Sequence, residues 1–214
     1  MKVALAQVKA VPEAFEANLT RARHLVEEAR TAGADVVVFP ELALSGYLIE
    51  GPGAARPADD PAILALGRSV DVVIGFAEAA DAGLFNSALY ISRGKALRLH
   101  RKITLPHYGM FREADRFRHG DSLRAFTTDY LPSVVLVCAD CWSLPLPFLA
   151  ARQGAQILYC LAASPEGGLP GQFDTRQCWH DMNSLYARLL SAYVVFVNRV
   201  GNEGELAFWG ESEV

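Results

Sequence analysis

The sequence predicts an α/β protein in one domain, and three observations support this fold class. Short runs of consecutive apolar residues recur along the chain, as in strands that are buried on both faces of a sheet. A stretch with apolar residues at helical spacing separates the first two runs, which is the strand–helix–strand order of neighbouring strands. A later segment alternates between apolar and small residues and then turns back, which is typical of a β-hairpin. With 214 residues and 51% hydrophobic composition, the chain is long enough to bury one sizeable core.

In the first half of the chain, predicted strands and helices alternate. Residues 3–8 are predicted to form a strand, residues 14–32 an amphipathic helix and residues 35–39 a second strand. Because such strands are neighbours in one sheet, the chain near Gln7 and near Glu41 is expected to lie close together. A surface loop over residues 51–61 is followed by a short helix (62–68), a third buried strand (70–76) and a hairpin (84–92 with 96–100).

In the second half, the segment 111–117 shows no periodicity and is predicted to be part of a long loop. A buried strand over residues 134–137 then ends on Cys138. A strand that starts at Glu205 is expected to have little room to pair before Val214, which leaves an edge and part of the core uncovered. The remaining predicted elements are a helix (145–154), a strand (155–161), a long helix (174–192), a strand (193–197) and a turn (198–201).

The composition excludes several classes of protein. The formal net charge is −4 and no basic run occurs, which argues against nucleic-acid binding. No apolar stretch is long enough to span a membrane, and the first residues are too few and too strand-like for a signal peptide. The four cysteines do not make a disulfide scaffold in a chain of this size, so we expect a cytoplasmic protein with free thiols.

Glu41, Lys102 and Cys138 lie at or just past the ends of predicted strands. Each has a simpler interpretation when taken alone: a carboxylate can cap a helix, a lysine can be a solvated charge, and a cysteine can be a small buried hydrophobe. Together they form a complete set for hydrolysing a carbon–nitrogen bond, with the thiol as nucleophile, the carboxylate as base and the lysine as partner of the developing anion. We expect Lys102 to favour the thiolate, and Cys141 to lie in the loop beyond.

Further motifs extend this pattern over essentially the whole chain. Phe39-Pro40-Glu41 is followed by Gly46-Tyr47, Arg101-Lys102 by Leu105-Pro106, and Cys138 by Asp140. Supporting matches are Asn86-Ser87, Glu113 between Phe111 and Phe117, Gly120-Asp121, Gly154-Ala155, Asn198-Arg199-Val200-Gly201, and Phe208, Gly210 and Ser212. In the order and spacing of these motifs, the sequence resembles the nitrilase superfamily of carbon–nitrogen hydrolases.

The resemblance implies a four-layer α-β-β-α sandwich of the nitrilase type. It implies a triad of Glu41, Lys102 and Cys138, no metal or organic cofactor, and Glu113 as a second carboxylate in the pocket. The implied reaction is hydrolysis of a small amide, an N-carbamoyl compound or a nitrile through a cysteine thioester. Homodimers or larger homo-oligomers are usual in that family.

The sequence departs from the family pattern in two places. After Trp142 the family commonly shows an aromatic residue, a proline and a glutamate, whereas residues 143–145 here are Ser, Leu and Pro, so the pocket wall differs. Family members also usually continue past the Gly-x-Ser motif, so residues 1–214 are expected to be a single carbon–nitrogen hydrolase domain that lacks its C-terminal strands. Candidates for lining the pocket are Tyr47, His107, Tyr108, Glu113 and Trp142.

Rival interpretations of the same residues remain open. Cys138 and Cys141 have the spacing of a redox pair or of half a zinc site, but Cys160 and Cys178 are too scattered to complete a tetrahedral site. A glutaminase module that supplies ammonia to a partner synthetase would use the same triad. A catalytically idle relative is the third alternative, and the intact triad argues against it.

Overall fold

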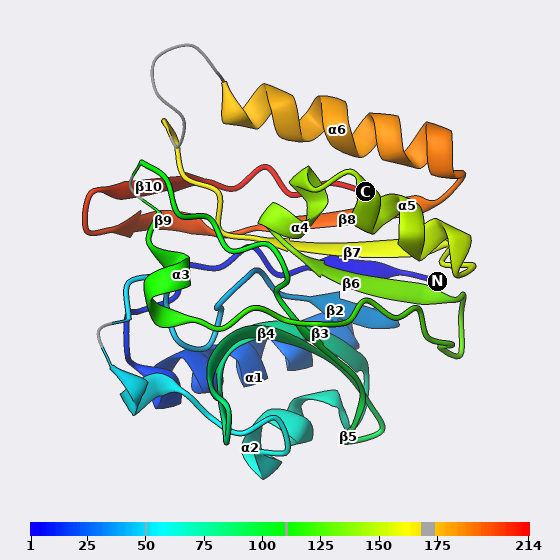
Figure 1. The fold of residues 1–214 in the computed structure, drawn as a ribbon. Helices are drawn as coiled ribbons and strands as arrows, with labels where there is room; N and C mark the ends of the chain where they lie inside the picture. Colours follow the sequence, from blue (N-terminus) through cyan, green and yellow to red (C-terminus); the bar gives the residue numbers. More distant parts are fainter. Residues whose placement is uncertain (50, 110, 168–173) are drawn as a thin grey trace.

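The computed structural model describes residues 1–49, 51–109, 111–167 and 174–214 as four layers in the order helix, sheet, sheet, helix (Figure 1). The helices α1 and α2 lie outside the first sheet, and α5 and α6 lie outside the second. The two sheets face each other across the middle of the molecule. The predicted four-layer sandwich is therefore confirmed.

The first sheet contains five strands in chain order, β1-β2-β3-β4-β5. Its first three strands are parallel, which confirms the predicted strand–helix–strand neighbours, and β3, β4 and β5 then pair antiparallel as meandering hairpins. These strands and their helices are β1 (Val3–Leu5), α1 (Phe15–Thr31), β2 (Val36–Val38), η1 (Pro52–Ala54), α2 (Pro61–Leu64), η2 (Ala65–Gly67), β3 (Asp71–Ala80), β4 (Gly83–Ser92) and β5 (Lys95–Arg101).

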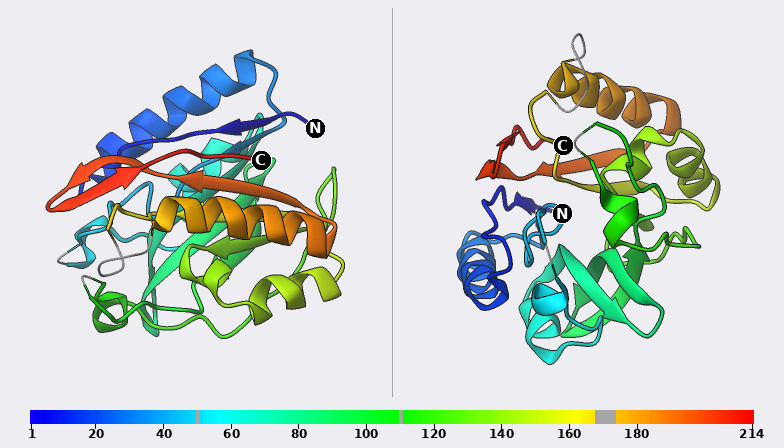
Figure 2. Two further views of the ribbon diagram at one scale, coloured as in Figure 1. Left: turned by 90° about the horizontal axis from the view of Figure 1, so that it is seen from above. Right: turned by 60° about the vertical axis from the view of Figure 1, so that its left-hand side comes forward.

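The second sheet contains three parallel strands in the order β6-β7-β8, followed by a separate hairpin, β9 with β10. In the left view of Figure 2 this red hairpin projects at one edge of the molecule. The elements are α3 (Glu113–Arg116), β6 (Ser133–Val137), α4 (Ala139–Trp142), α5 (Pro145–Arg152), β7 (Ile157–Ala162), α6 (Thr175–Leu190), β8 (Tyr193–Asn198), β9 (Val200–Glu203) and β10 (Leu206–Trp209).

The alternation of side chains along each buried strand explains why its sequence is apolar throughout. In β2, Val37 packs into the outer layer against α1, whereas Val36 and Val38 pack into the layer between the sheets. In β6, Val135 and Val137 likewise face the other sheet, and their neighbours face α6. Both faces of these strands are covered, and each fully buried valine contributes about 1.5–3 kcal/mol relative to an exposed one.

The long helix α6 has clear start and stop signals. The Asp174 side chain accepts hydrogen bonds from the backbone N–H groups of Arg176 (3.0 Å) and Gln177 (3.4 Å), and so caps the helix. Trp179 and Tyr186 are on its buried face, against the second sheet. Ser191 ends the helix in a left-handed conformation with a φ of 52°.

The structure corrects three expectations for secondary structure. Residues 200–203 form a strand that pairs with β10 over four residue pairs, so the strand predicted to lack a partner has one. Part of the predicted loop at 111–117 is the short helix α3. Cys141 lies in the helix α4 rather than in a loop. In the described parts of the chain, no helix has both the length and the apolarity that a bilayer crossing requires.

Candidate active site

The structure brings two of the three predicted residues into direct contact. Glu41 follows β2, and Lys102 follows β5, so both leave the first sheet at the same end. The Lys102 Nζ and the Glu41 Oε1 are 2.6 Å apart, and both side chains are fully buried. A lysine in this position is not the solvated surface charge that its sequence context alone allows.

Glu41 is held from three directions. Its Oε1 also accepts a hydrogen bond from the Asn86 Nδ2 (2.7 Å) in β4, and its Oε2 accepts one from the backbone N–H of Ala163 (2.8 Å) after β7. The chain can pass this close to β3 because Gly75 lies beneath it: a Cβ there would be only 2.6 Å from the Pro40 carbonyl oxygen. The carboxylate is therefore fixed by groups from both sheets.

A second carboxylate completes the surroundings of the lysine. The Glu113 Oε2 lies 2.7 Å from the Lys102 Nζ, and the Tyr47 hydroxyl donates to the Glu113 Oε1 at 2.7 Å. Burial alone would lower the pKa of the Lys102 ammonium, but the carboxylates of Glu113 and Glu41 outweigh it and raise that pKa well above its usual value. These carboxylates therefore favour the charged ammonium of Lys102.

Cys138 occupies a sharp turn between β6 and α4. Its backbone N–H donates to the Leu161 carbonyl oxygen (2.8 Å), which extends the ladder of the second sheet up to the thiol. Its φ of 46° is in the left-handed region, which costs a residue with a side chain about 1–3 kcal/mol. The second sheet holds the residue in this conformation, so the thiol is rigidly placed at the end of the strand.

The Cys138 thiol is more strongly protonated than the sequence predicts. Burial raises its pKa well above the usual value, the Glu41 carboxylate raises it further, and Lys102 lowers it without cancelling the rise. Lys102 acts toward the thiolate as expected, but burial and Glu41 outweigh it, so the net shift of the Cys138 pKa is upward. The same interactions show that all three groups share one electrostatic environment.

Asp140 joins the two sheets beside the thiol. Its Oδ1 accepts hydrogen bonds from the backbone N–H groups of Ile103 (3.0 Å) and Thr104 (2.8 Å), which follow β5. Its Oδ2 lies 2.8 Å from the His100 Nε2 and accepts from the backbone N–H of Val137 (3.2 Å). This fully buried carboxylate therefore fixes the turn after β6 against the end of β5.

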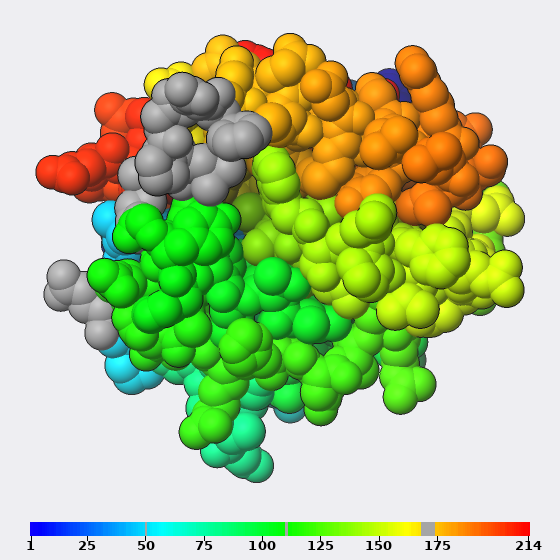
Figure 3. Space-filling view, turned by 45° about the horizontal axis from the view of Figure 1, so that its top comes forward, coloured from blue at the N-terminus to red at the C-terminus, as the bar shows by residue number. Residues whose placement is uncertain are grey.

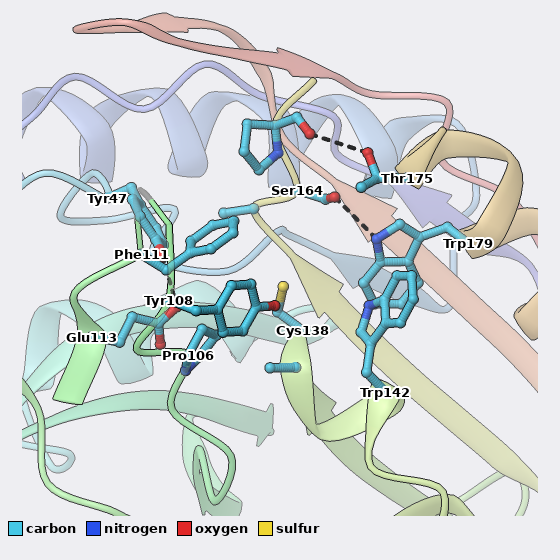
Figure 4. A pocket seen from close by; sticks show the side chains of 13 residues that line it. Tyr47, Pro106, Tyr108, Phe111, Glu113, Cys138, Trp142, Ser164, Thr175 and Trp179 are labelled. Atoms are coloured by element: carbon cyan, nitrogen blue, oxygen red, sulfur yellow. Dashed lines mark hydrogen bonds between the residues drawn. The ribbon is translucent and has the colours of Figure 1, made fainter. Parts of the chain in front are cut away.

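A cavity of about 60 Å³ opens beside the thiol. Figure 4 shows the Cys138 sulfur between two groups of aromatic rings, with Tyr108 and Phe111 on one side and Trp142 and Trp179 on the other. Figure 3 shows the surface hollowed between the green segment around α3 and the yellow-green and orange segments that carry α4 and α6. The lining residues are Tyr47, Pro106, Tyr108, Phe111, Glu113, Cys138, Ala139, Trp142, Ala163, Ser164, Pro165, Thr175 and Trp179.

Four of the five residues expected to line the pocket do so: Tyr47, Tyr108, Glu113 and Trp142. His107 does not, because its ring turns away to Asp115, with the Nδ1 3.5 Å from a carboxylate oxygen. The chain is irregular here, so the side chains of the neighbouring residues His107 and Tyr108 point in different directions.

The sequence profile of the family described as carbon–nitrogen hydrolase matches residues 2–214. The chain belongs to the carbon–nitrogen hydrolase family. It is 30% identical to a glutamine-dependent NAD(+) synthetase from Thermotoga maritima, over 100% of this chain and 38% of that protein. It is 29% identical to an N-carbamoylputrescine amidase from Oryza sativa, over 100% of this chain and 75% of that protein.

Solved structures share the fold of this chain. A glutamine-dependent NAD+ synthetase from Acinetobacter baumannii superimposes with a TM-score of 0.86 at 27% identity, over 98% of this chain and 40% of the synthetase. An amidase of the nitrilase superfamily from Nesterenkonia AN1 also superimposes with a TM-score of 0.86, at 22% identity, over 99% of this chain and 81% of the amidase. The chain thus spans about two fifths of the length of the synthetases that it matches.

In this carbon–nitrogen hydrolase chain, a buried ion pair outside the pocket holds the Tyr47 segment. The Arg199 Nη2 is 2.5 Å from the Glu203 Oε2 and also donates to the Ala10 carbonyl oxygen (3.1 Å). The Glu203 Oε1 accepts hydrogen bonds from the backbone N–H groups of Tyr47 (2.8 Å) and Leu48. The pair therefore fixes the backbone of the tyrosine whose hydroxyl contacts Glu113.

Sequence reasoning named Asn86 and Arg199 only as parts of supporting motifs and did not assign their contacts in the hydrolase-family site. The polar Asn86 within a strand and the charge of Arg199 directly after a buried strand were the available signals. The Ala163 N–H is a backbone group and leaves no signal in the sequence. All four cysteines are free, and Cys141 is buried in the core between the second sheet and its helices. Within the described residues, no group of three or more His, Cys, Asp or Glu side chains is arranged to hold a metal ion.

Proposed function

We propose that this chain hydrolyses a carbon–nitrogen bond of a small amide, an N-carbamoyl compound or a nitrile through a thioester on Cys138. The main support is the contact between Glu41 and Lys102, which lie fully buried at the end of one sheet. The thiol at the end of the other sheet is near enough for both charges to act on its pKa. A nucleophile, a base and a cation are then present together without exposure of the charged pair to bulk water.

The neutral thiol determines how the reaction begins. Because burial and Glu41 raise the pKa of Cys138, its proton must be removed during attack, and the Glu41 carboxylate accepts it. The sulfur bonds to the carbonyl carbon of the amide, and the carbonyl oxygen gains the negative charge. Lys102, whose charged form is favoured by its raised pKa, stabilises that oxygen.

Collapse of this intermediate breaks the carbon–nitrogen bond. Glu41 returns its proton to the nitrogen, which leaves as ammonia or an amine, and the acyl group stays on sulfur as a thioester. Water then attacks the thioester carbon while Glu41 again accepts a proton. Release of the acid and return of that proton to sulfur restore the thiol, so atoms and protons balance over the cycle.

Two cysteine variants test this proposal. Cys138→Ala should remove activity on a panel of amides, N-carbamoyl compounds and nitriles, and intact-protein mass spectrometry with a slow substrate should show an acyl adduct only when Cys138 is present. The matched control is Cys141→Ala, three residues away in α4, because Cys141 lies in the core and should be dispensable for turnover. Activity that survives in Cys138→Ala and disappears in Cys141→Ala would refute the proposed nucleophile.

The relatives favour one second candidate, a glutaminase module that delivers ammonia to a partner synthetase. Glutamine-dependent NAD(+) synthetases match this chain over its full length, while the chain covers only 38% of the Thermotoga maritima protein. That role requires glutamine to be the preferred amide. A comparison of glutamine with uncharged amides therefore separates the two candidates.

We also propose that the chain forms a homodimer or larger homo-oligomer through the outer helices α5 and α6. Large apolar side chains are exposed there, among them Phe148 on α5 and Leu189 on α6, the latter 70% exposed. Sedimentation velocity should show an assembly that Leu189→Asp converts to a monomer, whereas Leu97→Asp on β5 should leave it intact. A wild-type monomer at micromolar concentration would contradict this proposal.

A further inference from the structure

The walls of the pocket beside Cys138 are almost entirely apolar on both sides of the sulfur. Tyr108 and Phe111 meet edge to face, with ring centroids 5.5 Å apart, and form one wall. Trp142 and Trp179 meet in the same way at 5.4 Å and form the other. Figure 4 shows these four rings around the thiol, so a bound acyl group would lie between aromatic surfaces.

Three of the polar side chains of the lining make hydrogen bonds with protein groups, while the Tyr108 hydroxyl and the donor of the Ser164 hydroxyl face the cavity as neutral groups. The Ser164 Oγ accepts a hydrogen bond from the Trp179 Nε1 (3.0 Å), and the Thr175 hydroxyl donates to the Pro165 carbonyl oxygen (3.3 Å). The Tyr47 hydroxyl donates to Glu113. An acyl group in the pocket therefore meets few free polar side chains with which to replace its lost water.

No lining residue offers a free positive charge. Glu113 is the one charged side chain among the lining residues of the described pocket, and it is negative. Lys102 is fully buried and paired with the carboxylates of Glu41 and Glu113, so its ammonium is not a free cation for a ligand in the cavity. Residues 50, 110 and 168–173 lie outside the described chain, and their sequence contains no lysine, arginine or histidine.

The cavity also limits the length of the acyl group. Its volume of about 60 Å³ is several times the roughly 10–15 Å³ that one water molecule needs, which leaves room for an amide group and a few further heavy atoms. The part of a longer substrate that does not fit in the cavity would have to extend into solvent between Tyr108 and Trp142, which are 52% and 42% exposed.

We infer that the pocket selects amides with a short, uncharged and apolar acyl group and discriminates against acyl groups whose only charge is a carboxylate. This inference rests on the proposed hydrolase function. A carboxylate in this cavity would lose its water without gaining a cation and would face the carboxyl group of Glu113. An apolar acyl group of the same size would instead gain contact with the aromatic walls.

The test compares butyramide with succinamate, which has the same number of carbon atoms but a carboxylate in place of the terminal methyl. For the wild-type protein, kcat/KM for butyramide should exceed that for succinamate by about 100-fold or more. If succinamate equals or exceeds butyramide as a substrate, the inference is overturned.

A charge introduced into the wall provides the matched variant. Trp142→Arg places a cation at a half-exposed position and should raise the succinamate to butyramide ratio by about tenfold. Tyr193→Arg makes the same change at a 61% exposed residue at the start of β8, away from the pocket, and should leave the ratio unchanged. Equal ratios in the two variants would overturn the role of the aromatic wall.

Failure of the proposed function would give a different result from failure of the inference alone. In that case none of the amides is hydrolysed by any variant and no acyl adduct appears on Cys138, so the inference falls with the function. Hydrolysis with the reverse preference overturns the inference alone.

Discussion

At the scale of single residues, Glu41 acts on Cys138 in two ways that mutagenesis can separate. Its negative charge raises the pKa of the thiol, and in the proposed mechanism its carboxylate removes the thiol proton. Glu41→Gln should therefore lower the pKa of Cys138, measured from the ultraviolet absorbance of the thiolate. The same variant should reduce kcat/KM by about 10²–10⁴-fold, the usual contribution of a general base.

The control for Glu41→Gln is Glu27→Gln on the exposed face of α1, which should change neither quantity. A thiol pKa that rises in Glu41→Gln would contradict the electrostatic account. Undiminished turnover would instead contradict the role of Glu41 as base, so the two statements can fail independently.

At the scale of elements, the end of β9 controls the position of Tyr47. Glu203→Ala removes the acceptor for the Tyr47 and Leu48 N–H groups and leaves the buried Arg199 without its carboxylate. Loss of one partner of a buried ion pair costs about 3–5 kcal/mol, and urea unfolding should show a loss of that size. The kcat of the folded fraction should also fall, because the tyrosine that donates to Glu113 loses its backbone support.

Arg199→Met and Tyr47→Phe serve as comparisons for Glu203→Ala. Arg199→Met also breaks the ion pair but keeps the acceptor of the two N–H groups, so it should be destabilised without an equal loss of kcat. Tyr47→Phe removes only the hydroxyl bonded to Glu113 and should lower kcat with little change in the unfolding free energy. A Glu203→Ala protein with wild-type kcat would refute the positioning role.

The C-terminal segment is attached to α6 by a titratable group. The His180 Nε2 is 3.1 Å from Glu211, and its Nδ1 is 2.8 Å from Glu213. Burial of the ring opposes protonation, but the hydrogen bonds to both carboxylates outweigh it and raise the pKa of His180. The charged ring therefore stabilises the folded state.

The pKa of His180 is higher in the folded state than in the unfolded state. The stabilisation is therefore complete below the unfolded-state pKa of about 6.5, and it is lost as the pH rises through the folded-state pKa. The melting temperature of the wild type relative to His180→Asn should thus fall across that window. Replacing both Glu211 and Glu213 with Gln removes the two carboxylate partners of the ring and should abolish this trend. A difference that grows with pH would contradict this assignment.

The same elements show which parts of the structure a sequence can predict. The strands β2 and β6 were predictable because both faces are buried, which requires an unbroken apolar run. The strand β9 was not, because its glycine and asparagine are typical of a turn and its pairing with β10 depends on tertiary contacts. The helices α3 and α4 have four residues each, too few for a periodic pattern.

The residues of the candidate site also divide into those that the sequence can predict and those that it cannot. Glu41, Lys102 and Cys138 were found because charged or nucleophilic residues interrupt the pattern at strand ends, and motif spacing reinforced them. The net pKa of the thiol was not predictable, because burial contributes most to it and burial depends on the packed structure. The turn of His107 toward Asp115 depends on local chain direction, which residue types do not specify.

At the scale of the whole molecule, the site exists only where the two sheets meet. Asp140 connects them through three hydrogen-bond contacts, one to His100 in β5 and two to the chain just after Lys102. Loss of activity in urea should therefore coincide with loss of the core signal from Trp179, followed by fluorescence. Asp140→Asn should shift both midpoints together to lower urea concentration. Inactivation well before unfolding would show that the site can separate while the sandwich stays intact.

The division of the site between the sheets also constrains how such a chemistry can be inherited. Glu41 and Lys102 come from the chain that forms the first sheet, and Cys138 and the Ala163 N–H from the chain that forms the second. Under the proposed mechanism, a fragment with only one of these sheets would lack either the nucleophile or the base. An exchange of chain segments between relatives would therefore keep the proposed activity only if both sheets stayed together.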